Sequence, residues 1–385
     1  MPVQDPQEFF DELKEWSERK LNILEGYLDP FVKVLGSLRR VEQVYYVDAF
    51  AGKGIYQDGA KGSAIRAAEL AQRYQDEHKP YRLRCINVEA NQENFENLQT
   101  NTQVFRDLVT NLPGTLEDNI NTILRITSGN PALFFLDPFG VKALDWQIIQ
   151  RIIHRGFGTD LWIRFDYSAV IRLHGRYHSE DVGAFKSFDL LRQVYGIQDR
   201  DDLYDLLVGN TVEEKRNRAI NVYLNQIAEE FQSTRKKNFA APYIIRAITE
   251  KDKYCLIFAT GHPTGATIAS ELLYGVEETY QREVEDYKDS KPRQLSLFSS
   301  KEPSKKEIFD DKVNRLKQTI WAKCQGQQLT RLDIYERVLP EWFGRIKSPH
   351  LTQALKELIS EGKIEAYSGT PGHRKSVFLF GRDKS

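Results

Sequence analysis

The stretch VYYVDAFAGKG, residues 44–54, joins a short apolar run to a glycine-rich turn. Residues 44–47 are all β-branched or aromatic, which is typical of a buried strand. Gly52 and Gly54 follow, and the pattern after them is helical. A buried strand that leads through a glycine turn into a helix begins a βαβ unit. This stretch therefore predicts an α/β fold built on a parallel sheet.

Similar apolar runs recur along the chain, separated by helical stretches: RLRCINVE (82–89), PALFFLDPF (131–139) and TDLWIRF (159–165). The alternation predicts a doubly wound, Rossmann-like sheet. APYIIRAIT (241–249) and KYCLIFAT (253–260) flank a charged turn and predict an antiparallel pair that closes a methyltransferase-type sheet. The polar segment 168–238 predicts a helical insertion. Near the N-terminus, Asp29-Pro30 predicts a break between two helices.

Composition divides the chain into two predicted domains. Residues 1–287 hold the Rossmann-like pattern, and residues 288–305 form a linker rich in Lys, Pro and Ser. Residues 306–385 show three helical stretches and two short strands, which predicts a winged helix, a variant of the helix-turn-helix. The net charge of −1 hides an asymmetry, because residues 301–385 hold 17 Lys and Arg against 11 Asp and Glu. A basic excess in one small domain suits contact with phosphates.

The turn after the first strand has the D-x-F-x-G-x-G form found in S-adenosylmethionine-dependent methyltransferases. Its members are Asp48, Phe50, Gly52 and Gly54. Glycines there let the backbone approach the methionyl part of the cofactor. Glu89 ends the second strand, where an acid can accept both ribose hydroxyls. A third acid is expected after the next strand, and Glu117 is the candidate for the adenine amine. The alternative for the glycine loop is an ordinary strand-to-helix turn, and the alternative for Glu89 is a solvated glutamate at the end of a strand.

The fourth predicted strand ends in Asp137-Pro138-Phe139-Gly140, where amino-methyltransferases carry D-P-P-Y or a relative. There the carboxylate and backbone carbonyls accept hydrogen bonds from an exocyclic amine, and an aromatic ring stacks on the base. Asp137, Pro138 and Phe139 are thus the candidate catalytic residues. The motif departs from D-P-P-Y at two positions and resembles that of tRNA guanine-N2 dimethyltransferases. A structural Asp-Pro turn is the alternative.

Five segments together resemble the bacterial three-Cys-motif partner proteins: KLNILEGYL (20–28), YVDAFAGKG (46–54), KGSAIRAA (61–68), FFLDPFG (134–140) and YCLIFATGHPTG (254–265). The resemblance covers roughly residues 16–285 and places Lys20 and Tyr27 within the family's motifs. It implies a methyltransferase-like fold and a functional partner, a radical-adenosylmethionine protein with a three-cysteine motif. The chain has Leu116-Glu117-Asp118-Asn119 where the family often has G-D-x-N.

Basic residues mark two candidate nucleic-acid surfaces. The first follows the fifth predicted strand, within WIRFDYSAVIRLHGRYH (162–178), and the second is the winged helix, where helical spacing turns three side chains outward. The candidates are Arg164, Arg172 and Arg176 in the first, and His350, Gln353, Lys356, Arg374 and Lys375 in the second. A solvated loop and a protein-interaction module remain the alternatives.

The linker contains one apolar cluster, in which Gln294, Leu295, Leu297 and Phe298 resemble the Q-L-[S/D]-L-F peptide that docks on the bacterial sliding clamp. Packing against a flanking domain is the alternative.

The sequence lacks the patterns that are typical of metal-binding, membrane and secreted proteins. The three cysteines have no C-x-x-C spacing and the histidines no H-E-x-x-H, so we expect no metal site. Without an apolar run long enough to span a bilayer, and without a signal peptide, we expect a cytoplasmic protein.

Two functions remain open. One is methyl transfer to an amino group in nucleic acid, DNA being favoured over RNA, in modification or repair. The other is a non-catalytic accessory protein that binds the cofactor and recruits a partner enzyme to DNA.

Overall fold

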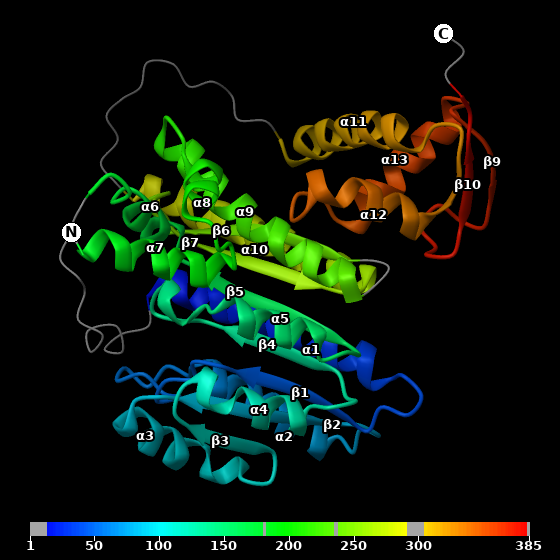
Figure 1. Ribbon diagram of the computed structural model, residues 1–385. Coiled ribbons are helices and arrows are strands. Elements are labelled where there is room, and N and C mark those ends of the chain that lie inside the picture. Colours follow the sequence, from blue (N-terminus) through cyan, green and yellow to red (C-terminus); the bar gives the residue numbers. More distant parts are fainter. Residues whose placement is uncertain (1–13, 180–181, 235–237, 291–303, 383–385) are drawn as a thin grey trace. The chain divides into compact units, whose positions relative to one another are not determined.

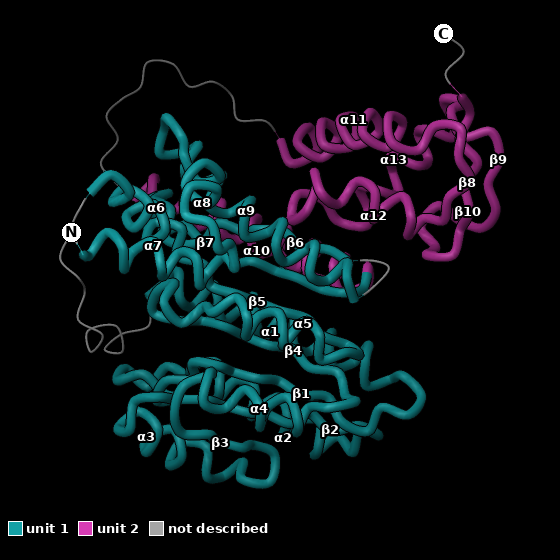
Figure 2. The backbone as a smooth tube through the Cα atoms, viewed as in Figure 1, with its two compact units in different colours: residues 1–262 teal, residues 263–385 magenta. Residues whose placement is uncertain are grey.

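The computed structural model describes residues 14–179, 182–234, 238–290 and 304–382. The chain forms two compact units, residues 1–262 and 263–385 (Figure 2). The boundary precedes the long helix α10 (Pro263–Asp289), which the sequence groups with the first domain.

The first unit is built on a seven-stranded sheet in the order β3-β2-β1-β4-β5-β7-β6 (Figure 1). The strands are β1 (Gln43–Asp48), β2 (Arg82–Glu89), β3 (Val109–Pro113), β4 (Ala132–Leu136), β5 (Thr159–Phe165), β6 (Phe239–Arg246) and β7 (Asp252–Thr260). The first five pair in parallel, whereas β7 is antiparallel to both β5 and β6. The predicted Rossmann-like sheet and its closing antiparallel pair are confirmed. The strand order reverses between β1 and β4, which is where such sheets bind ligands.

Helices cover both faces of this sheet because successive side chains of a strand point to opposite faces. Ile163 and Phe165 of β5 belong to the core that includes α4 (Leu116–Ile126) and α5 (Trp146–His154). Trp162, directly before Ile163, packs edge-on against Tyr27 of α1 (Glu15–Gly36) on the opposite face. The remaining helical elements of this part are α2 (Ser63–Asp76), α3 (Gln92–Thr102) and the 3-10 turns η2 (Gln103–Phe105) and η3 (Val141–Ala143).

Helix α1 continues through Pro30, so the predicted break at Asp29-Pro30 is wrong. Tyr27 and Leu28 before the proline are buried, as are Phe31 and Val32 after it. We attribute the continuous helix to this burial on both sides, which offsets the backbone hydrogen bond that proline cannot donate.

The described part of the predicted insertion forms four helices: α6 (Tyr167–His174), α7 (Val182–Tyr195), α8 (Arg200–Leu207) and α9 (Val212–Thr234). Aromatic contacts join it to the sheet. Tyr223 of α9 stacks on Phe165 of β5 with ring centroids 4.7 Å apart, and Trp146 of α5 packs edge-on against the same tyrosine. The insertion thus shares the core that supports the end of β5.

The second unit contains α10, α11 (Lys305–Cys324), α12 (Arg331–Trp342) and α13 (Ser348–Ser360). Its antiparallel sheet has the order β8-β10-β9, formed by β8 (Gln328–Thr330), β9 (Ile364–Ser368) and β10 (Val377–Phe380). The short strand β8 was not predicted. The Ser270 hydroxyl and the Glu271 carboxylate of α10 accept hydrogen bonds from the backbone N–H groups of Gly344 and Ser348, each 3.0 Å long. These bonds tie α10 to the segment between α12 and α13.

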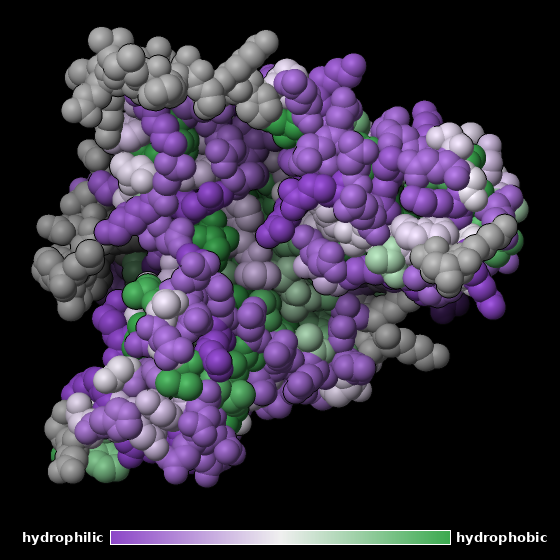
Figure 3. All heavy atoms as spheres, turned by 90° about the horizontal axis from the view of Figure 1, so that it is seen from above, coloured by the Kyte–Doolittle hydropathy of each residue, from purple (hydrophilic) through white to green (hydrophobic). Residues whose placement is uncertain are grey.

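Within the described residues, no helix is long and apolar enough to cross a membrane. The face drawn in Figure 3 is mostly hydrophilic, with smaller hydrophobic areas between the charged side chains.

Candidate functional site

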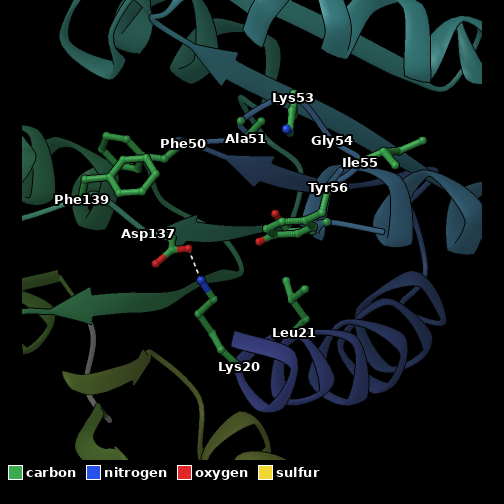
Figure 4. Close-up of a pocket in the computed structure, with 13 residues that line it drawn as sticks. Lys20, Leu21, Phe50, Ala51, Lys53, Gly54, Ile55, Tyr56, Asp137 and Phe139 are labelled. Atoms are coloured by element: carbon green, nitrogen blue, oxygen red, sulfur yellow. Dashed lines mark hydrogen bonds and ion pairs between the residues drawn. The ribbon is translucent and has the colours of Figure 1, made fainter. Parts of the chain in front are cut away.

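A pocket lies beside the carboxyl ends of β1 and β4, where the strand order reverses (Figure 4). Residues from four separate segments line it: Lys20 and Leu21 of α1, residues 50–56 after β1, Gly62 and Ser63 at the start of α2, and Asp137 and Phe139 after β4. The structure therefore joins the glycine turn and the D-P-F-G motif in one site.

The glycine turn has a backbone shape that requires glycine at two points. Gly52 and Gly54 have φ values of 62° and 81°, which side chains disfavour. A Cβ at Gly54 would also lie 3.2 Å from the Leu98 side chain. The turn is closed by the Gly62 N–H, which donates to the Gly54 carbonyl over 2.7 Å. Backbone thus forms one wall of the pocket.

Glu89 fixes this turn from the end of β2. Its carboxylate accepts hydrogen bonds from the backbone N–H of Gly52 over 2.8 Å and from that of Asn91 over 2.7 Å. Each carboxylate oxygen can accept further hydrogen bonds. The acid therefore positions the turn and keeps acceptor capacity for hydroxyl groups.

Asp48 lies beneath the turn and does not line the pocket. It is fully buried, and it accepts hydrogen bonds from the Phe50 N–H over 3.2 Å and from the Tyr46 hydroxyl over 3.1 Å. Burial raises the pKa of Asp48 to about 6, although these donors oppose the shift. Asp48 thus supports the turn from the core.

Three charged side chains meet at the D-P-F-G motif. Lys20 forms an ion pair with Asp137 Oδ2, drawn as a dashed line in Figure 4. Arg164 of β5 places Nε 3.7 Å from Asp137 Oδ1 and donates a hydrogen bond to the Pro138 carbonyl over 2.6 Å. Its guanidinium lies 4.7 Å from the ring centroid of Tyr254. Arg164, predicted to contact nucleic acid, here holds the motif in place.

Lys20 was not among the predicted site residues, although the family resemblance included it. Only its separation of 117 residues from Asp137 conceals the pairing. A lysine on the buried face of an amphipathic helix was the available signal, since buried lysines are rare unless paired.

Phe139 provides an aromatic surface at this pocket. It lines the pocket and is 57% exposed, so that its ring is accessible to a ligand. Phe50, from the glycine turn, lines the same pocket and is partly buried against the core.

Glu117 lies apart from the lining residues. It is exposed in the first turn of α4, while its neighbour Asp118 caps that helix with Thr115. Its predicted contact with an adenine amine stays a prediction.

The remaining candidate nucleic-acid residues differ in exposure. Arg172, Arg176, Lys356 and Lys375 are exposed, as is Arg374, which contacts the Thr264 hydroxyl. Gln353 is half-buried and donates to Glu357 over 2.9 Å.

The predicted outward orientation of His350 is wrong, because the side chain is only 3% exposed. Its ring lies 4.5 Å from that of Phe309 and 5.3 Å from that of Tyr274 in α10. Nδ1 accepts the Lys347 N–H over 3.0 Å, and burial lowers the pKa of His350. Helix α10, which covers this face, was predicted to belong to the other domain.

Gln294, Leu295, Leu297 and Phe298 lie outside the described residues. Among the residues that the structure describes, no cluster of His, Cys, Asp or Glu could hold a metal ion, and Cys85, Cys255 and Cys324 are buried free thiols.

Comparison with known proteins gives distant structural similarity alone. No protein-family model and no curated protein matches the chain. A Legionella pneumophila protein has a TM-score of 0.39 at 12% identity, covering 68% of this chain and 92% of its own. The O-methyltransferase TomG from Streptomyces achromogenes, solved with S-adenosylmethionine, has a TM-score of 0.31 at 12% identity, covering 66% and 94%. A Bacillus cereus O-methyltransferase, solved with S-adenosylhomocysteine, scores 0.31 at 12% identity, covering 65% and 82%. At these scores the fold of this chain rests on its own strand order.

Proposed function

We propose that the protein is an S-adenosylmethionine-dependent methyltransferase that acts on an amino group of a nucleic-acid base. One observation carries the proposal: a glycine turn fixed by Glu89 and a D-P-F-G motif with an exposed aromatic ring line the same pocket at the switch point of the sheet.

The residues present fit this cofactor. Gly52 and Gly54 put backbone rather than side chains against the pocket, which suits close approach of the methionyl part. Glu89 retains acceptor capacity for the two ribose hydroxyls. The ammonium group of Lys20 supplies a cation where the cofactor would bring a carboxylate.

When bound, the cofactor supplies an electrophilic methyl group. Asp137 and the Pro138 carbonyl would accept hydrogen bonds from the acceptor NH₂ and turn its lone pair toward that methyl. Phe139 would stack on the base. The acceptor nitrogen would release one proton to solvent after taking the methyl group.

The second unit would bring this activity to nucleic acid. After α10, its helices and strands follow in the order α11-β8-α12-α13-β9-β10, which is the order expected of a winged helix. Exposed Lys356, Arg374 and Lys375 suit phosphate contact, with DNA as the favoured ligand. A radical-adenosylmethionine protein and the sliding clamp are proposed partners.

Calorimetry with S-adenosylmethionine and S-adenosylhomocysteine, followed by transfer of a labelled methyl group to mixed DNA and RNA, tests the proposal. We expect binding and label in nucleic acid. Asp137→Ala should abolish transfer while cofactor affinity stays within a few-fold, because Asp137 acts on the acceptor. No binding by the wild-type protein would overturn the proposal. Equal loss of binding and transfer would make Asp137 a cofactor or folding residue.

A non-catalytic accessory role is the second candidate. It is favoured by the ion pair of Asp137 with Lys20, which engages the carboxylate that an acceptor amine would need. Cofactor binding without transfer to any nucleic acid would support this candidate.

A further inference from the structure

The ion pair between Lys20 and Asp137 is the feature of the pocket that the proposed reaction leaves unexplained. The Lys20 side chain is 3% exposed and the Asp137 side chain 16%. Within the described residues, Asp137 is the carboxylate that Lys20 pairs with. Removing two charges from water is costly, and an apolar pair of similar size would often be as stable. A buried pair that lines a ligand pocket therefore suggests a function beyond stability.

The partners of the two groups differ. Asp137 has a second cation nearby, since Arg164 Nε lies 3.7 Å from Oδ1. Its Oδ1 atom is buried and has no hydrogen-bond partner among the described residues. Asp137 could therefore lose Lys20 and remain near a positive charge, with one oxygen already able to accept. Lys20 would need another anion.

The proposed cofactor brings such an anion to this wall. Its amino-acid end is a zwitterion, and the glycine turn that would receive it lines the same pocket as Lys20. Exchanging one carboxylate for another keeps the buried ammonium neutralised. It also releases Asp137 to orient an amine.

We infer that Lys20 receives the α-carboxylate of the cofactor and gives up Asp137 when the cofactor binds, so that cofactor binding prepares the acceptor site. This inference rests on the proposed function. It predicts that cofactor binds before the acceptor, and it assigns to Lys20 a role in cofactor binding.

The test compares two ligands on matched variants by calorimetry. S-adenosylhomocysteine carries the carboxylate, whereas 5′-methylthioadenosine lacks the whole amino-acid end. Lys20→Met should weaken the binding of S-adenosylhomocysteine at least about tenfold and leave the affinity for 5′-methylthioadenosine within about twofold of the wild type. The reason is that a buried charged hydrogen bond is lost with the first ligand alone. Lys20→Arg should restore part of the affinity. Lys33→Met, at an exposed lysine of the same helix that does not line the pocket, should change the affinity for both ligands little.

Asp137→Asn separates exchange from a structural role. Without its carboxylate partner, Lys20 is free in advance, so S-adenosylhomocysteine should bind as tightly as to the wild type or more tightly. If Lys20→Met melts at a much lower temperature, the same ligand comparison is made between Asp137→Asn and the Lys20→Met, Asp137→Asn double variant, in which both charges are gone.

Equal effects of Lys20→Met on the two ligands, or a loss in Asp137→Asn as large as that in Lys20→Met, would overturn the exchange while leaving the proposed function intact. A wild-type protein that binds neither ligand would overturn the proposed function, and the exchange with it.

Discussion

Asp48 and Glu89 end neighbouring parallel strands, and both accept hydrogen bonds from the glycine turn. Their surroundings separate their roles. Asp48 is enclosed by the core, whereas Glu89 is half-buried beside the pocket. Two mutations test this division at the scale of single residues.

Glu89→Ala should weaken S-adenosylmethionine binding at least about tenfold, or about 1.4 kcal/mol, because the ribose hydroxyls lose their acceptor and the Gly52 N–H loses its partner. Calorimetry measures the change. Glu93→Ala, in the first turn of α3, is the matched control and should bind like the wild type. Unchanged affinity in Glu89→Ala would contradict the assignment.

Asp48→Asn should remove a pH dependence of stability. The pKa of Asp48 is about 6 in the folded protein and near 3.8 when unfolded, so the folded state binds more protons between these values. Ionisation therefore lowers wild-type stability as the pH rises through this range. The free energy of unfolding of Asp48→Asn, taken relative to that of the wild type, should therefore rise by about 2 kcal/mol from about pH 4.5 to about pH 7.5. The other acids titrate alike in both proteins and cancel in this difference. Urea unfolding at both pH values measures this gain. A difference that does not vary with pH would show that Asp48 has an ordinary pKa.

At the scale of elements, the link from β1 to α2 decides the shape of the pocket. Gly54 and Gly59 both lie in this link, with φ values of 81° and 83°. A Cβ at Gly54 would crowd Leu98 and Ile65, whereas a Cβ at Gly59 would meet no atom within 4 Å. Comparing alanine at these two positions therefore separates the cost of backbone strain from the cost of crowding.

Gly59→Ala should lower the free energy of unfolding by about 1 kcal/mol, the cost of a left-handed alanine. Gly54→Ala should cost about 1 kcal/mol more because of crowding, and it should also weaken cofactor binding. Urea unfolding and calorimetry give both quantities. Equal destabilisation, with cofactor affinity unchanged, would mean that Gly54 is needed only for its backbone angle.

At the scale of the whole molecule, charge is divided unevenly along the chain. Residues 301–385 carry an excess of six basic residues, and residues 1–300 an excess of seven acidic ones. Helix α10 contributes hydrogen bonds to the second unit, so a fragment that tests its binding should begin at residue 263 rather than at 301.

The fragment 263–385 should bind duplex DNA with an affinity that falls as salt rises, because bound cations release counterions from the phosphates. Replacing Lys356, Arg374 and Lys375 by Ala should weaken binding and flatten the salt dependence. Lys306→Ala, exposed on α11, is the control and should change both less. Fluorescence anisotropy at several salt concentrations measures these effects. An affinity that does not change with salt concentration, or no binding at low salt, would instead favour a protein-interaction module.

The sequence alone determined six strands of the large sheet, the helical insertion and the residues of the glycine turn, because these follow from the pattern of neighbouring residues. The apolar run before Asp48 predicts β1, and the two runs around the charged turn predict the antiparallel pair β6 and β7. The break expected from Pro30 was wrong, because burial on both sides of the proline sustains the helix.

The tertiary structure alone decided which partner each charged side chain meets. Lys20 and Asp137 are 117 residues apart, and Arg164 turns to the Pro138 carbonyl rather than to solvent. His350 lies on a face that helical spacing marks as outward, yet Tyr274 of α10 covers it. Local sequence sets the direction of a side chain relative to its own helix or strand. What lies in that direction depends on how distant elements pack, and only the folded chain brings those elements together.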